Sequence, residues 1–227
     1  MDLNLPFLKV WWSVSLKYRK CSDTYGGFPY DTLPPLNKAL FKGDFGWLDH
    51  MDDDLKRKLS VYRRPEAEER IKKNLSKIQR MAEELGISLP EEFVKFMSSE
   101  EMRLQIPSCT ACYFDLPEKT VRLPIKNGGY AVRFLNDQQE IFLWYLYISP
   151  DSKTSIIVSS IMFDEENLDE IPEDVLISNI HYSAPSFEEF LYRFWLENSI
   201  WYALDEKKKL TPSQEEYLNH YKKMKKK

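Results

Sequence analysis

Glycine is scarce in this sequence. The chain has 227 residues but only seven glycines, a share well below the roughly 7% of average usage. Loops that hold phosphate groups need several glycines at fixed spacing. Neither a Walker loop nor a GxGxxG motif occurs. This scarcity disfavours nucleotide-binding enzymes.

Cysteines and long apolar runs are scarce as well. Three cysteines, Cys21, Cys109 and Cys112, are too few for a disulfide framework and favour a reducing compartment. The longest apolar run, residues 141–148, has eight residues, whereas a membrane span needs about 18. The N-terminus lacks the basic and apolar regions of a signal peptide. We therefore expect a cytoplasmic protein without a membrane segment.

Basic residues are concentrated at one end of the chain. Residues 207–227 hold eight lysines and two acids and so carry a charge of +6. The net charge of the whole chain is −4, so the preceding 206 residues carry −10. Phosphate binding needs clustered Lys and Arg, so the acidic body disfavours nucleic-acid binding. We interpret the tail as a solvated end, with contact to nucleic acid or a membrane surface as the alternative.

Hydrophobic periodicity predicts the fold class. It indicates early helices at about residues 48–59, 65–85 and 88–98, the last opened by a capping box of Ser88 and Glu91. The predicted strands span residues 103–106, 111–114, 121–125, 131–135, 141–148 and 155–163. Capping boxes at Ser186 and Thr211 open two C-terminal helices. Because strands do not alternate with helices, we expect an α+β fold. It should have a mainly antiparallel sheet, helices packed on it, a helical N-terminal part and two C-terminal helices.

The pattern divides the chain into three parts. Residues 1–64 are expected to form an extension packed on the body, with turns or extended connectors at 25–29 and 33–36. Residues 65–203 form the α+β domain, and residues 204–227 form a C-terminal helix and basic tail.

No recognised catalytic or metal motif is present. The Cys109–Cys112 CxxC has neither further zinc ligands nor a βαβ setting, so we interpret it as two free thiols. The acids around His50 are interpreted as the negative N-terminal charge of a helix. We expect no enzymatic activity, metal or cofactor. An enzyme with an unfamiliar site at His50 or His181 remains a further hypothesis.

Two sets of residues are candidates for binding. The first is an acidic loop, a site for a basic partner: Asp164, Glu165, Glu166, Asp169, Glu170, Glu173 and Asp174. The second is an aromatic set that suggests a small-molecule pocket: Trp144, Tyr145, Tyr147 and Trp195. The alternative for the acidic residues is a solvated loop without a partner. The alternative for the aromatic residues is the hydrophobic core.

Three segments carry a family resemblance. The run 85–93, Leu-Gly-Ile-Ser-Leu-Pro-Glu-Glu-Phe, follows an amphipathic helix and resembles the opening signature of the SUKH superfamily. Residues 186–191, Ser-Phe-Glu-Glu-Phe-Leu, are similar to its closing helix, and residues 137–147 to its central hairpin. The resemblance covers about residues 65–203. One departure is the Asn127-Gly128-Gly129 turn, which that family often places shortly after the Leu-Pro helix, about thirty residues earlier.

The resemblance implies a binding function. Fungal members of that superfamily are interaction scaffolds, and bacterial members are immunity proteins that neutralise polymorphic toxins, commonly nucleases. We therefore expect a non-enzymatic protein-binding domain whose partner is a basic toxin domain. A small-molecule-binding or regulatory module with an aromatic pocket is the alternative.

Overall fold

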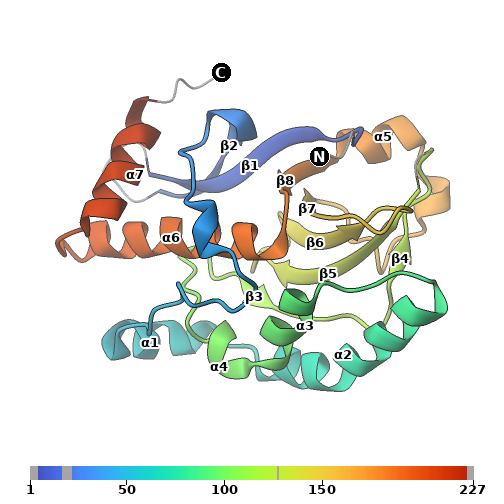
Figure 1. The fold of residues 1–227 in the computed structure, drawn as a ribbon, viewed down its shortest axis with the longest axis horizontal. Helices are drawn as coiled ribbons and strands as arrows, with labels where there is room; N and C mark the ends of the chain where they lie inside the picture. The colour runs from blue at the N-terminus through green and yellow to red at the C-terminus, as the bar shows by residue number, and fades with distance from the viewer. Residues whose placement is uncertain (1–4, 17–21, 127, 224–227) are drawn as a thin grey trace.

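The computed structural model describes residues 5–16, 22–126 and 128–223; Cys21, Asn127 and the end of the lysine tail lie outside them. The expected α+β class is confirmed, with helices packed on a mostly antiparallel sheet (Figure 1). The strands are β1 (Leu8–Ser15), β2 (Ser22–Pro29), β3 (Tyr113–Phe114), β4 (Val121–Arg122), β5 (Tyr130–Asn136), β6 (Leu143–Ile148), β7 (Thr154–Ser159) and β8 (Ile180–Ala184). The α-helices are α1 (Asp53–Leu59), α2 (Pro65–Glu84), α3 (Glu91–Ser98), α4 (Glu100–Arg103), α5 (Glu173–Ser178), α6 (Phe187–Asp205) and α7 (Pro212–Lys223). Short 3-10 turns are η1 (Tyr30–Thr32), η2 (Lys38–Leu40), η3 (Ser60–Tyr62) and η4 (Leu168–Glu170).

The strands form one sheet in the order β2-β1-β8-β7-β6-β5-β3, with β4 also on β5. Every pairing is antiparallel except β1 with β8. All six residues of β6 are buried, as its unbroken apolar run predicts, and β6 forms a hairpin with β7. This strand is therefore an interior strand of the sheet that is covered on both faces.

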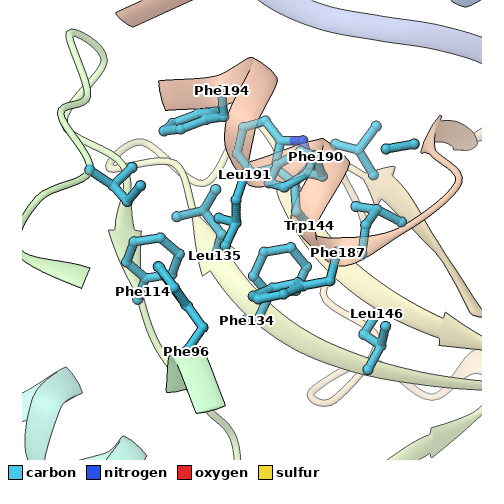
Figure 2. Packing of buried hydrophobic residues seen from close by; sticks show 14 of the residues in the cluster. Phe96, Phe114, Phe134, Leu135, Trp144, Leu146, Phe187, Phe190, Leu191 and Phe194 are labelled. Atoms are coloured by element: carbon cyan, nitrogen blue, oxygen red, sulfur yellow. The ribbon is translucent and has the colours of Figure 1, made fainter. Parts of the chain in front are cut away.

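Each face of the sheet carries its own hydrophobic core. One core joins the sheet to α2, α3 and α6, and the smaller core joins the other face to η4 and α5. Figure 1 shows α1 to α4 gathered along one side of the sheet and α5 at the other. In Figure 2, Phe187 and Phe190 of α6 pack against Phe134 and Trp144 of the strands. Phe187, Phe190 and Phe194 of α6 thus lie in the larger core.

Helix starts follow the predicted capping signals in two of three cases. Ser186 Oγ accepts a hydrogen bond from Glu189 N at the start of α6. Thr211 and Gln214 exchange both bonds of a capping box before α7. The prediction of a capping box at Ser88 is wrong, because α3 begins after Pro90 and no side chain caps this helix.

The strand predicted at residues 103–106 is also wrong. Ser99 Oγ accepts from Met102 N and caps α4, so Arg103 lies in a helix. The Arg103 guanidinium is buried, pairs with Glu68 and donates to the carbonyls of Phe96 and Met97. This tertiary pairing outweighs the weak local strand signal.

The first 64 residues contribute strands as well as turns. Residues 25–29, interpreted as a turn or an extended connector, belong to β2 and pair with β1. At Gly27 a Cβ atom would lie 3.2 Å from the Trp12 ring, so the glycine permits close packing of the two strands. The hairpin was missed because its glycines favour a turn in isolation.

Buried acids on α6 hold this N-terminal segment. Glu188 accepts hydrogen bonds from Gly43 N, Phe45 N and Trp47 Nε1, and Glu197 accepts one from Trp11 Nε1. Because a buried carboxylate without donors is costly, these bonds tie the segment to the helix. None of the helices among the described residues has the length and apolar character that a membrane crossing requires.

Candidate functional site

The predicted acidic loop follows β7 and runs into α5. It comprises a turn, η4 and the first turn of α5. Six of its seven acids are exposed; we call these six the acidic surface: Glu165, Glu166, Asp169, Glu170, Glu173 and Asp174. The seventh, Asp164, is turned inward, with a side-chain exposure of 6%.

Asp164 is the anchor of this loop. Its two carboxylate oxygens accept from Arg133 Nε at 2.9 Å and Arg133 Nη2 at 2.6 Å. The same guanidinium donates to Asn136 Oδ1 at 3.0 Å. A bidentate, nearly buried pair of this kind fixes both position and orientation. The pair holds the start of the loop against β5, while the acids that follow face water.

Apolar side chains fix the rest of the loop. Phe163 is buried and stacks on Tyr145 with ring centroids 4.3 Å apart. Leu168 of η4 and Leu176 of α5 are buried in the smaller core. The loop is therefore docked through its buried side chains rather than solvated on all sides.

The acidic surface keeps its charge largely uncompensated. In the described part of the chain, none of its six carboxylates forms an ion pair, although Glu173 accepts from Lys126 N and Glu170 from Asn167. Val175, next to Asp174, is 44% exposed and adds an apolar element. Fixed like charges beside an exposed apolar side chain suit the docking of a basic protein surface.

The four aromatic candidates do not converge on one pocket. Trp144 faces the larger core, whereas Tyr145 and Tyr147 face the smaller core on the opposite side of the sheet. All three are almost fully buried. Trp195 is half-buried and lines a separate cavity of about 190 Å³ that includes His50. Alternation along β6 explains the split, because successive side chains of a strand point to opposite faces.

Tyr147 contacts the turn that contains Gly128 and Gly129. Its Oη donates to Gly128 O at 2.8 Å, and a Cβ on Gly129 would lie 2.5 Å from the same ring. Gly129 also has φ +108°, which favours glycine. The predicted glycine turn thus closes over Tyr147.

The CxxC segment forms a hydrogen-bonded turn. Cys109 and Cys112 are both free thiols, as expected. Cys112 Sγ lies 3.3 Å from Tyr25 Oη and 3.2 Å from Thr110 Oγ1. Burial raises the pKa of the Cys112 thiol. A raised pKa opposes nucleophilic and redox chemistry, which needs the thiolate.

The acidic residues beside His50 lie at the start of α1. Asp52, in the cluster beside His50, caps α1 by accepting from Asp54 N and Leu55 N. Among the residues that the structure describes, no three His, Cys, Asp or Glu side chains are grouped to hold a metal ion. His181 is half-buried beside Trp12, and desolvation lowers its pKa.

One cavity was not anticipated from the sequence. It has a volume of about 290 Å³ and lies among α1, η3, α2, α4, β3 and α6. None of the residues proposed from the sequence for partner or ligand binding lines it. Its walls come from segments up to about 140 positions apart, so no local pattern could have marked it.

Comparison of the chain with protein-family models, curated proteins and solved structures gives no match. The SUKH resemblance, with the function that it implies, therefore stays a prediction.

Proposed function

We propose that this chain is a non-enzymatic protein-binding domain whose acidic surface docks a basic partner. We further propose, on the resemblance described above, that it is an immunity protein that neutralises a nuclease-type toxin. One observation carries the proposal: a run of exposed acids lies on a loop that is anchored by the Arg133–Asp164 pair and by buried Leu168 and Leu176. Concentrating like charge is unfavourable in the free protein, so a partner of opposite charge would relieve it.

Preorganisation supports binding over simple solvation. A mobile acidic loop would lose conformational entropy on binding, whereas this loop is already ordered by its anchors. Basic clefts of nucleases bind phosphate groups, so carboxylates presented in fixed positions can compete for the same cations. Binding of this kind should form rapidly and weaken with salt.

The test takes the product of the reading frame next to this chain's gene as the candidate toxin. The affinity of purified wild type for that product is measured by calorimetry at low and moderate salt. The same is done for the double variant Glu165→Lys/Asp169→Lys. The matched control is Glu83→Lys/Glu84→Lys, which reverses two exposed acids at the end of α2 and changes the net charge equally.

We expect the loop variant to weaken binding at least about tenfold, corresponding to about 1.4 kcal/mol, with little effect of the control. Co-expression should restore growth of toxin-producing cells with wild type and not with the loop variant. Equal affinity for the loop variant and wild type would overturn the acidic surface as the binding site. A neighbouring basic domain that binds without loss of toxicity would overturn the immunity role.

A further inference from the structure

The unanticipated cavity has an apolar floor. Ile106, Phe114, Leu135 and Phe194 line it and are at most 9% exposed. Figure 2 shows Phe114, Leu135 and Phe194 arriving from β3, β5 and α6. Three separate elements thus present hydrocarbon to one space. Its volume of about 290 Å³ is near the lower end of small-ligand pockets, roughly 300–1,000 Å³.

The walls of this cavity are rich in cations. Five basic residues line it: Lys56, Arg63, Arg64, Lys72 and Arg103. Three acids line it as well: Glu68, Glu69 and Glu100. The lining therefore carries a formal charge of +2, although the first 206 residues carry −10. A positive site on an acidic protein is the reverse of what composition predicts.

The acids of the lining are already paired. Glu68 pairs with Arg103, and both Glu69 and Glu100 lie within 3.5 Å of Lys72 Nζ. In contrast, neither Lys56 nor Arg63 forms an ion pair within the described residues. Arg64 lies over the Tyr113 ring at 5.5 Å and makes a cation–π contact there. The charge left for a ligand is therefore positive.

The backbone at the cavity is strained. Ala111, one of the lining residues, has φ +55°, in the left-handed region that a residue with a Cβ rarely adopts. Cys112 N donates to Ser108 Oγ at 2.9 Å and helps to hold this turn. The turn thereby places Ala111 in the wall of the cavity.

We infer that this cavity binds a small organic anion: a carboxylate with an apolar body. The apolar body lies against Phe114, Leu135 and Phe194, and the carboxylate lies at the mouth near Lys56 and Arg63. Hydrocarbon burial supplies most of the affinity and the cations select the charged head. No residue of this cavity belongs to the acidic surface, so the inference does not depend on the proposed partner.

The test compares octanoate with octan-1-ol, which share the chain and differ in charge. Calorimetry on the full chain should show saturable octanoate binding with a Kd on the order of millimolar or tighter. Octan-1-ol should bind several-fold more weakly. Raising the salt concentration should weaken octanoate binding and leave octan-1-ol unaffected.

Two kinds of variant locate the site. Lys56→Gln/Arg63→Gln should weaken octanoate binding about threefold to tenfold, the range expected for one partly exposed and one exposed charge. Arg57→Gln/Lys119→Gln is the matched control, since these exposed cations do not line the cavity. Leu104→Trp places an indole in the cavity and should abolish binding of both ligands.

Cooperative urea unfolding of each variant verifies that it folds. The inference is overturned if octan-1-ol binds as tightly as octanoate, or if the two charge variants behave alike. It is also overturned if a folded Leu104→Trp protein binds normally, or if no saturable binding occurs up to about ten times the expected Kd.

Discussion

Tyr25 Oη donates a hydrogen bond of 2.7 Å to Asp137 Oδ1, across 112 positions of the chain. Tyr25 belongs to β2, at one end of the strand order, and Asp137 follows β5, near the other end. The same hydroxyl meets Thr110 Oγ1 at 2.9 Å and Cys112 Sγ at 3.3 Å. The N-terminal hairpin thus crosses to the opposite edge of the sheet.

Removing this hydroxyl should destabilise the protein. We expect Tyr25→Phe to lower the free energy of unfolding by about 1–3 kcal/mol, because Asp137 Oδ1 loses its donor in a buried position. Urea unfolding followed by circular dichroism measures the change. Tyr62→Phe is the control, since Tyr62 is 47% exposed, and should cost less than about 0.5 kcal/mol. Equal stabilities of the two variants would contradict the bridging role of Tyr25.

Removing one partner of the Arg133–Asp164 pair should lower the free energy of unfolding strongly. Replacing both partners together should cost less than the two single replacements combined. We expect Asp164→Asn or Arg133→Met alone to cost about 3–5 kcal/mol, because each leaves one nearly buried charge without its bidentate partner. The double variant should lose less than the sum of the single losses. Urea unfolding of the four proteins completes a double-mutant cycle. Strict additivity would show that the pair does not act as a unit.

The same pair should control order in the acidic loop. Asp164→Asn should speed amide hydrogen exchange at residues 165–171 while β6 keeps its protection, because only the anchor is lost. Lys72→Gln removes the exposed pairs of Lys72 with Glu69 and Glu100 and is the comparison. Unchanged exchange in the loop would mean that Leu168 and Leu176 alone hold it.

Cys112 should resist alkylation in the folded protein. Burial raises its pKa, so at pH 7–8 both the thiolate fraction and access to the reagent are small. We expect iodoacetamide to modify Cys112 at least about tenfold more slowly in native buffer than in urea, because both factors act together. Peptide mass mapping resolves each cysteine. Native labelling as fast as in urea would instead favour a reactive thiol.

His181 should make stability depend on pH. Desolvation beside Trp12 lowers its pKa below the ordinary 6.5. The unfolded chain then binds a proton more readily than the folded chain, so stability falls as pH drops from about 6.5 to the folded pKa. His181→Gln should flatten the unfolding free energy between about pH 7 and 5 relative to wild type. A pH dependence that is unchanged in His181→Gln would contradict this role of His181.

Local signals predicted the elements whose own periodicity or caps decide them. The α2 stripe, the Ser186 and Thr211 caps and the apolar β6 run each depend on neighbours within a few residues, and the structure confirms them. The acidic loop is likewise visible as composition, and so are the free thiols. Where local and distant interactions compete, as at residues 103–106 and in β2, the sequence interpretation was wrong.

The amino-acid sequence alone determined the α+β class, because periodicities of two and 3.6 residues are properties of short segments. Only the tertiary structure decided that Asp164 is an anchor while its acidic neighbours are exposed, because its partner Arg133 lies 31 positions away. It likewise split Trp144 from Tyr145 and Tyr147 across the sheet. The cationic cavity is likewise decided by the tertiary structure, because its lining comes from segments between Met51 and Phe194 that share no local pattern.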